Sequence, residues 1–271
     1  MCSKKEKKLK NRIEPEKNKH EKERTRYGAQ AALHGGMKTV INAIPDNWPM
    51  ALHLAEGSLH TVQTWYAYQG YRILNGMEEK KVLQPMPGKD LVYTGHYIDH
   101  ELVSNIEVDC AARKARKQAG KPMRFLLTIG GAGAQTESFA TEALTGEVEG
   151  IHGFYHANIF EAVYCTNLLM RSCDVLVTKP SELSFYPVPK LFIKRVGGHE
   201  RWGAIHAAHI GDGTLECEDI PHTLQMLQMF LEDENYLPMM CDNIERNKKA
   251  GVYDGAYKVV ELAMKRKGQN R

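Results

Sequence analysis

The 271-residue chain lacks a long apolar run, a secretory signal and any closely spaced cysteine pair. No uninterrupted apolar stretch approaches the roughly 20 residues that a membrane helix needs. The Lys-rich N-terminus is not followed by the apolar segment of a signal peptide. The six cysteines are scattered and form no CxxC motif. These absences predict a cytoplasmic protein with reduced thiols, without a disulfide framework or a structural zinc site.

Signatures of several enzyme classes are also missing. The chain has no GxxxxGK[ST] phosphate loop, no GxSxG nucleophile elbow and no HExxH zinc motif. P-loop nucleotidases and serine hydrolases are therefore disfavoured. Three histidine pairs at helical spacing have no carboxylate in a suitable register, so we interpret them as surface residues and expect no bound metal: His96/His100, His152/His156 and His206/His209.

Positive charge is concentrated at the N-terminus. Residues 1–26 contain eleven Lys or Arg and five Glu, a net charge of +6, whereas the whole chain carries only +3. This segment has one Leu, one Ile and no aromatic residue, too little apolar surface to offset the entropy of ordering. It is predicted to be a charged flexible tail. A basic arm for nucleic acid is the alternative, but mixed Lys and Glu without Arg–aromatic interleaving argue against it.

Apolar segments of strand length alternate with helical patterns after the tail. The predicted strands are continuously apolar, which is typical of a parallel sheet buried on both faces. The chain is therefore predicted to be α/β with a Rossmann-like parallel sheet. The predicted strands are 38–44, 58–64, 123–129, 174–178 and 190–196, and the predicted helices are 65–75, 99–118, 158–171, 220–233 and 253–265.

A glycine-rich turn follows the strand predicted at 123–129. Such a turn allows close backbone approach, and a following helix N-terminus favours an anionic phosphate. The dinucleotide motif GxGxxG is incomplete because Thr136 stands at its third glycine, which disfavours nicotinamide and flavin dehydrogenases. A tight turn without a ligand remains an equal alternative. The candidate residues here are Gly130, Gly131, Gly133, Ala134 and Gln135.

Two further loops follow predicted strands. In a parallel sheet these loops and the glycine turn share the carboxyl edge, where ligands bind. Lys179 could pair with a phosphate, and Glu182 or Glu200 could accept sugar hydroxyls. The alternatives are a solvated Lys179 and a Glu200 that pairs with Arg195 or Arg201. The candidates in the two loops are Lys179, Ser181, Glu182, His199 and Glu200.

The order of these motifs resembles the C-terminal half of GT-B glycosyltransferases. The resemblance rests on GGAGAQ after the first strand, CDVLVTKPSE at the donor loop, and VGGHERWGA, with VYTGHYID at the entry to the C-domain. The bacterial UDP-N-acetylglucosamine transferase that makes lipid II and the plant monogalactosyldiacylglycerol synthases are similar in this way. The resemblance spans roughly residues 38 to 264.

The resemblance implies transfer of a sugar from a UDP-sugar to an unknown acceptor. It implies no cofactor and no catalytic metal, and it places the substrate-binding residues in the three loops. It also implies an abbreviated N-terminal α/β segment at 27–98 and a GT-B-like nucleotide-sugar-binding domain at 99–271. Peripheral membrane contact stays open, and no catalytic base is assigned.

The sequence also departs from the GT-B pattern. The usual Gly-Gly-x-Thr loop is replaced by Pro-Ser-Glu-Leu-Ser-Phe-Tyr-Pro, so Glu182 would have to substitute for the usual ribose-binding Glu. Fewer βα units separate the glycine turn from DVLVT than in the family. A non-catalytic nucleotide-binding or regulatory module on a degenerate half-fold is therefore the alternative function.

Overall fold

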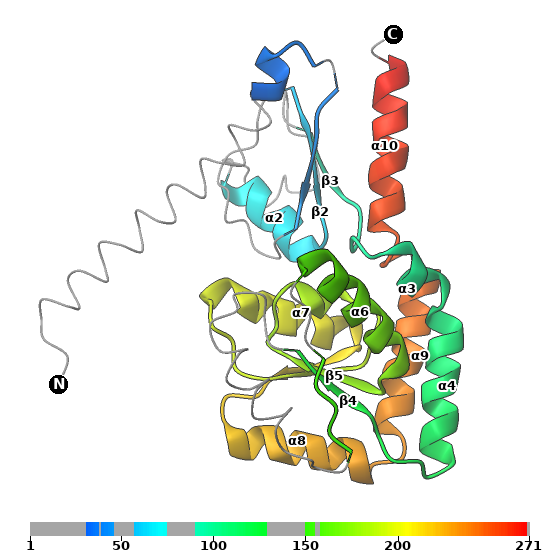
Figure 1. The fold of residues 1–271 in the computed structure, drawn as a ribbon. Helices are drawn as coiled ribbons and strands as arrows, with labels where there is room; N and C mark the ends of the chain where they lie inside the picture. The colour runs from blue at the N-terminus through cyan, green and yellow to red at the C-terminus, as the bar shows by residue number, and fades with distance from the viewer. Residues whose placement is uncertain are drawn as a thin grey trace, which may run out of the picture. The chain divides into compact units, whose positions relative to one another are not determined.

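The computed structural model describes residues 31–37, 39–45, 57–74, 90–128, 150–154 and 158–269. The chain divides into two compact units, residues 1–97 with 254–271 and residues 98–253. Each unit contains a sheet of parallel strands with helices packed beside it (Figure 1). The chain is therefore α/β with parallel sheets, as the sequence predicted. The glycine turn Gly130–Gln135 and the tail 1–26 lie outside the described residues.

The N-terminal unit is built on a three-stranded sheet of order β1-β2-β3. The middle strand, β2, is flanked by a strand on each side and is buried along its whole length. Thr64 caps the helix that follows it, because its hydroxyl accepts a hydrogen bond of 3.1 Å from the backbone N–H of Ala67. The named elements of this unit are β1 (Ile41–Ile44), β2 (Leu59–Val62), α2 (Trp65–Leu74), β3 (Asp90–Tyr93) and α10 (Gly255–Gln269).

The C-terminal helix α10 belongs to the N-terminal unit. An antiparallel bridge joins Tyr97 to Asp254, and the Gly255 N–H donates to the His96 carbonyl at 2.9 Å. A Cβ on Gly255 would collide with the backbone of Gly95, so this approach requires glycine. The sequence-based boundary kept 254–271 with the C-terminal domain. It could not show these backbone contacts with residues 95–97.

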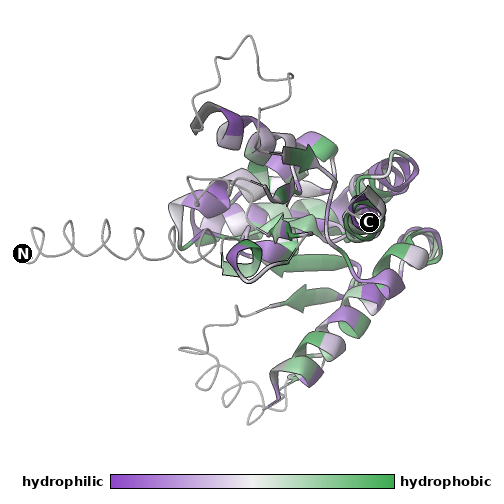
Figure 2. Ribbon diagram, turned by 90° about the horizontal axis from the view of Figure 1, so that it is seen from above, coloured by the Kyte–Doolittle hydropathy of each residue, from purple (hydrophilic) through white to green (hydrophobic). Residues whose placement is uncertain are grey.

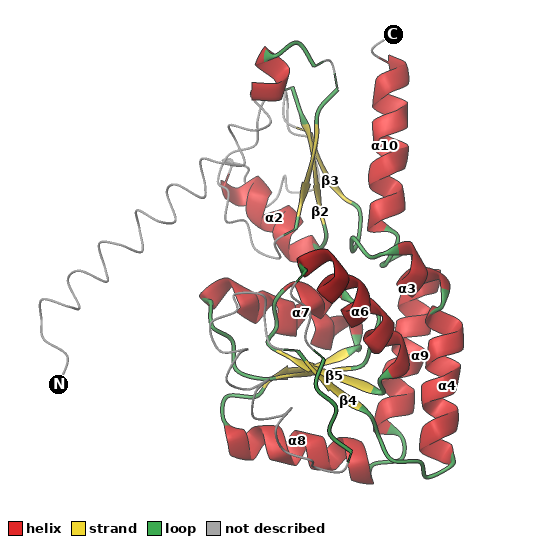
Figure 3. Ribbon diagram, viewed as in Figure 1, coloured by secondary structure: helices red, strands yellow, loops and turns green. Residues whose placement is uncertain are grey.

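The C-terminal unit is built on a four-stranded parallel sheet of order β4-β5-β6-β7. Figure 3 shows helices around this sheet, with α6 and α7 above it and α8 below it. Helices α4 and α9 pack side by side. The elements are α3 (His100–Ser104), α4 (Ile106–Gln118), β4 (Phe125–Leu127), α6 (Ile159–Ser172), β5 (Val175–Thr178), η2 (Glu182–Phe185), β6 (Lys190–Phe192), η3 (Gly198–Glu200), α7 (Arg201–Ile210), β7 (Gly213–Glu216), α8 (Ile220–Glu232) and α9 (Tyr236–Lys249).

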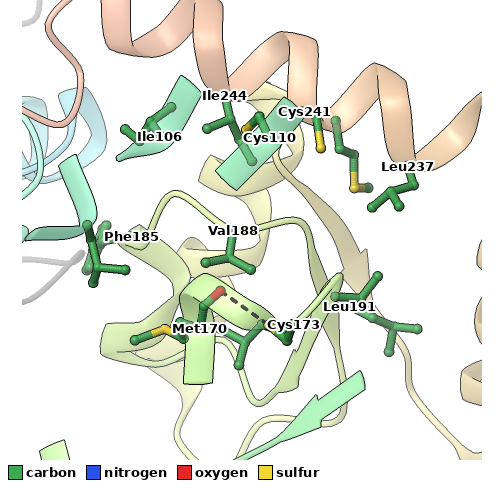
Figure 4. Close-up of a cluster of buried hydrophobic side chains, with 14 of the residues drawn as sticks. Ile106, Cys110, Met170, Cys173, Phe185, Val188, Leu191, Leu237, Cys241 and Ile244 are labelled. Carbon is green, nitrogen blue, oxygen red and sulfur yellow. Dashed lines mark hydrogen bonds between the residues drawn. The ribbon is translucent and has the colours of Figure 1, made fainter. Parts of the chain in front are cut away.

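The main hydrophobic core lies in the C-terminal unit between its sheet and its helices. Figure 2 shows hydrophobic strands beside helices on which hydrophilic and hydrophobic segments alternate. Cys110 from α4 and Cys241 from α9 lie side by side in this core (Figure 4), and both are buried free thiols. Burying such apolar surface is worth about 25 cal/mol per Å², so this core is the main stabilising feature of the unit.

The helix predicted at 99–118 is two helices. Leu102, Val103, Ile106 and Cys110 form one apolar stripe along this segment of the sequence, and all four are buried. The break falls at Asn105, whose side-chain amide donates to the carbonyl of Glu101 at 2.7 Å. Asn, Asp, Ser and Thr side chains compete with the helix for backbone groups in this way.

Arg113 belongs to the basic stretch in the second half of α4, yet it is buried. Its guanidinium donates to the carbonyl of Met170 at 2.7 Å and to that of Cys173 at 2.9 Å. These carbonyls lie at the end of α6, where helical carbonyls have no intrahelical partner. Arg113 therefore caps the C-terminus of α6, a helix distant in sequence.

Candidate functional site at the carboxyl edge of the C-terminal sheet

The loops after β5 and β6 lie at the same edge of the C-terminal sheet. Strands β5 and β6 are parallel neighbours, with Thr178 paired to Phe192 at their carboxyl ends. Lys179 follows the first of these ends, and the segment from Ile193 to Glu200 follows the second. Ligands of open α/β sheets bind outside this edge. The two loops that the sequence singled out are therefore neighbours in the structure.

A salt bridge joins the two loops. The ammonium of Lys179 lies 2.6 Å from Oε1 of Glu200. The second carboxylate oxygen of Glu200 accepts the backbone N–H groups of Val196 at 2.7 Å and Gly197 at 3.0 Å. Glu200 is 5% exposed, whereas the Lys179 side chain is 29% exposed. Glu200 is thus enclosed and fully used, while Lys179 keeps a solvent-facing side.

The ionised form of Glu200 is favoured by its partners. Burial alone would raise the pKa of this carboxyl group. The hydrogen bond from Lys179 and those from the backbone at Gly197 and Val196 outweigh burial, so the pKa is lowered. The carboxylate therefore holds its loop and Lys179 in place as a charged group. It pairs with neither Arg195, which bonds Glu216, nor Arg201.

The remaining predicted residues of these two loops are all at least partly exposed. Ser181 is half-buried and lies before the short helix η2 without capping it by its side chain. Glu182 is exposed and has no ion pair among the described residues. The ring of His199 lies against Gly197, where an added Cβ would approach it to 2.6 Å. Ser181, Glu182 and His199 thus remain available to a ligand.

The two loops are also joined by close packing that the sequence did not indicate. Gly203 in α7 lies so close to the other loop that an added Cβ would stand 2.5 Å from the carbonyl oxygen of Pro180. The same Cβ would lie 2.8 Å from the hydroxyl of Ser184, a buried side chain. Helix α7 therefore packs directly on the loop after β5. A glycine inside the run RWGAIHAAHI was the available signal.

A second ion pair lies at the opposite, amino edge of the sheet. Lys190 begins β6, and Asp212 directly precedes β7. Their charged groups are 2.8 Å apart, and both side chains are 0% exposed. Tyr253 donates its hydroxyl to Asp212 at 2.9 Å, and Lys190 also donates to the carbonyls of Tyr186 and Val188. Burial lowers the pKa of Lys190 and raises that of Asp212.

The sequence did not single out this second pair. Lys190 was only the first residue of the strand predicted at 190–196, and Asp212 fell in no predicted element. A charged residue at the start of the strand KLF was the only local signal. The pairing itself depends on the register of β6 and β7, which brings Lys190 beside Gly213.

The histidine prediction was wrong for two residues. His206 is 6% exposed and His96 is 0% exposed, so neither is a surface residue. Burial, Lys190 and His209 lower the pKa of His206 to about 3. His206 is therefore neutral at pH 7. Its ring lies near that of Phe185, with the centroids 6.3 Å apart, inside the packing between α7 and η2.

Metal binding and membrane spanning find no support in the described part of the chain. It contains no group of three or more His, Cys, Asp or Glu side chains arranged to hold a metal ion. Among its helices, none has both the length and the apolarity required to cross a bilayer.

Comparison with known proteins yields two family matches. Residues 24–73 match a domain of unknown function, DUF6937. Residues 86–141 and 136–264 match a second domain of unknown function, DUF6938. No curated protein matches the chain. The DUF6938 match includes both candidate loops and both ion pairs and covers more than half of the chain, so the protein belongs to the DUF6938 family.

Proposed function

We propose that the C-terminal unit binds a nucleotide-sugar, a UDP-sugar, at the carboxyl edge of its sheet and transfers the sugar to an acceptor. The observation that carries this proposal is the salt bridge between Lys179 and Glu200. It fixes two loops together at the edge where parallel α/β sheets bind ligands. The resemblance to GT-B glycosyltransferases supplies the donor class and the reaction.

Charge at this edge suits a diphosphate. Lys179 uses one donor on Glu200, and an ammonium has three. The other donors can meet phosphate oxygens on the exposed side of the lysine. Helix α7 begins directly after Glu200, and its first N–H groups carry the positive end of the helix dipole. Both features would stabilise a departing diphosphate without a metal ion.

Within this proposal, the predicted residues take different roles. Glu182 would accept hydrogen bonds from ribose hydroxyls, Ser181 would donate to them or accept from them, and His199 would lie near the sugar. Gly130, Gly131, Gly133, Ala134 and Gln135 would contact the diphosphate or close the cleft. Glu200 would act as a positioning residue, because its oxygens already bind Lys179 and two backbone amides.

A non-catalytic nucleotide-binding module is the second candidate, and the sheet order favours it. The described strands of the C-terminal unit follow the order β4-β5-β6-β7 without a reversal. The ligand crevice of doubly wound folds lies where the strand order reverses. The connection from β5 to β6 is also short and contains only a single 3-10 turn. Without a crevice for both donor and acceptor, such a unit would bind a nucleotide at its loops but would not transfer a sugar.

A thermal-shift titration with UDP, UDP-glucose, UDP-N-acetylglucosamine, ADP and NAD tests the binding step. A ligand at 100 times its dissociation constant adds about 2.7 kcal/mol to the free energy of unfolding. We expect stabilisation by UDP or a UDP-sugar and none by NAD. Cooperative melting without a shift for any of the five would contradict the proposal.

A matched pair of lysine variants locates the site. Lys179→Met should weaken the affinity for UDP about tenfold, and the stabilisation by UDP should fall accordingly. This corresponds to the loss of roughly 1.4 kcal/mol expected for one charge-assisted contact. Lys114→Met is the control, because Lys114 is 26% exposed and also pairs with carboxylates, Asp242 and Glu245, on the outside of α4 and α9. Equal losses in both variants would argue against a site at Lys179.

Turnover separates the two candidate functions. Release of UDP from a UDP-sugar in the presence of a mixture of sugar and lipid acceptors is expected for a transferase. Tight UDP-sugar binding without UDP release under any acceptor would support the non-catalytic module.

A further inference from the structure

Three aromatic side chains and an arginine form a cluster in the N-terminal unit. The indole of Trp65 stacks on the ring of Tyr93, with centroids 4.7 Å apart and planes 30° apart. Tyr68 and the indole form a T-shaped pair, with centroids 5.3 Å apart and planes at 85°. Arg72 lies over the ring of Tyr68, 5.4 Å from its centroid, and donates to its hydroxyl at 3.3 Å. Trp65 is thus held in one orientation by two tyrosines.

This cluster lies at the carboxyl edge of the N-terminal sheet. Tyr93 is the last residue of β3, paired with Val62 at the end of β2. Trp65 begins α2, three residues after that end. The neighbouring turn is fixed, because the Thr94 N–H donates to the Val62 carbonyl at 3.0 Å. Ligands of parallel sheets bind at this edge, so the cluster stands where a binding site is expected.

The indole is exposed although it is rigidly held. Trp65 is 50% exposed, whereas Tyr68 and Tyr93 are half-buried behind it. One face of the indole is occupied by Tyr93, so its exposed surface is that of a fixed aromatic plate. Fixing such a side chain before binding removes an entropy cost that a mobile tryptophan would bring to the complex.

The polar tips of the stacked pair are unused. Across the described ranges, the indole N–H of Trp65 and the hydroxyl of Tyr93 make no hydrogen bond. Burial raises the pKa of the Tyr93 hydroxyl, so it remains protonated and can both donate and accept. Buried or half-buried Tyr and Trp groups ordinarily find a partner. The pair therefore offers an apolar face bordered by hydrogen-bonding groups.

We propose that Trp65 and Tyr93 form a binding site for a pyranose ring. A pyranose has one face lined by C–H groups, which suits the indole plate, and a rim of hydroxyls, which suits the two polar tips. A nucleobase also has a flat face, but it lacks a hydroxyl rim. This site lies in the other unit from the proposed nucleotide site, and its test uses no nucleotide-sugar.

Saturation-transfer NMR with the full chain tests this site. The probes are methyl β-D-glucopyranoside, methyl β-D-galactopyranoside and N-acetylglucosamine, with uridine and adenosine in separate samples. We expect transfer to the ring C–H protons of at least one pyranoside. No transfer to any pyranoside would overturn the pyranose assignment. Nucleoside transfer that is lost in Trp65→Ala would identify a base-stacking site in its place, whereas nucleoside transfer that survives in Trp65→Ala would belong to the C-terminal unit.

Two substitutions place the binding at the indole. Trp65→Ala should weaken pyranoside binding at least about tenfold, in line with the loss of one stacking partner. Trp65→Phe keeps an aromatic face and should restore most of the affinity. Tyr257→Ala is the control, because Tyr257 is an exposed aromatic residue, 39% exposed, on α10 of the same unit. Unchanged binding by a folded Trp65→Ala protein would contradict the proposal.

Discussion

The two ion pairs of the C-terminal unit differ in burial and in position. Lys190 and Asp212 lie at the amino edge of the sheet, and neither side chain is exposed. Lys179 and Glu200 lie at the carboxyl edge, where the lysine is 29% exposed and the glutamate is buried. Both pairs join segments of neighbouring strands. The first is sealed inside the fold, whereas the second presents a positive charge to solvent.

This difference indicates different roles. A sealed pair has lost its water, so each charge depends on its partner. Its hydrogen bonds to Tyr253 and to the carbonyls of Tyr186 and Val188 then fix the chain around it. A half-open pair costs less to separate and can exchange one contact for a ligand. The carboxyl edge is therefore suited to binding, and the amino edge to holding the sheet together.

The largest contrast is expected on removing the two lysines. Lys190→Met leaves Asp212 as a buried, unpaired carboxylate and should lower the free energy of unfolding by about 3–5 kcal/mol. Lys179→Met should lower it by at most about 1 kcal/mol, because the pair is partly solvated. Urea denaturation of both variants measures the difference.

A double variant isolates the pairing. Lys190→Met with Asp212→Asn removes both charges and should recover much of the lost stability. Equal losses for Lys190→Met and Lys179→Met would remove the distinction between the two edges.

A smaller effect is expected for the packing of α7 at the carboxyl edge. Gly203→Ala places a methyl group 2.5 Å from the Pro180 carbonyl oxygen, so α7 and the loop after β5 must separate. Overpacking of this kind costs about 1–3 kcal/mol. We expect this loss in a thermal melt together with weaker UDP binding. Gly198→Ala, at a glycine with open space around its Cβ, should cause no such loss of stability. A Gly203→Ala protein with wild-type stability and wild-type UDP affinity would show that α7 and the loop after β5 need not be in close contact.

The third effect is a pH dependence from buried His206. Its pKa is lowered from 6.5 to about 3 in the folded protein, chiefly by burial. Between these values the unfolded chain binds the proton and the folded chain does not. The free energy of unfolding should therefore fall as pH decreases from 6.5 toward 3, by up to about 1.4 kcal/mol per pH unit.

His206→Gln should remove this contribution to the pH dependence of the free energy of unfolding. His222→Gln, at an exposed position on α8, should leave it in place. Urea denaturation at pH 7, 6 and 5 measures it. If the free energy of unfolding depended on pH equally in the wild-type protein and in His206→Gln, the assignment of His206 as buried and neutral would be contradicted.

Much of the fold could be predicted from local sequence patterns. Continuous apolar segments such as DVLVT became buried strands, and the stripe on 99–118 became the buried face of α3 and α4. Helix α7, strand β7 and helix α9 were not predicted. Helix α7 contains Gly203 and two histidines, and β7 is only the four residues GTLE, so their patterns are weak. The predicted strand 190–196 ends at Phe192, where the loop toward Glu200 begins.

The candidate site was predictable in part, because its loops follow strands that the sequence pattern predicts. Strand order alone placed Lys179 and Glu200 at one edge, because both follow parallel strands. That they bind each other depends on the path of residues 193–200, which no local pattern encodes. The pairs Lys190–Asp212 and Trp65–Tyr93 likewise depend on strand register and on a turn between distant segments.

Hydrogen–deuterium exchange with and without UDP-N-acetylglucosamine tests the central claim most directly. If the carboxyl edge binds the nucleotide, backbone amides in residues 179–185 and 193–203 should exchange more slowly in its presence. Amides around Lys190 and Asp212 at the amino edge should be unchanged. Protection confined to the amino edge, or no protection in either loop at a saturating ligand concentration, would contradict the assignment of the binding site.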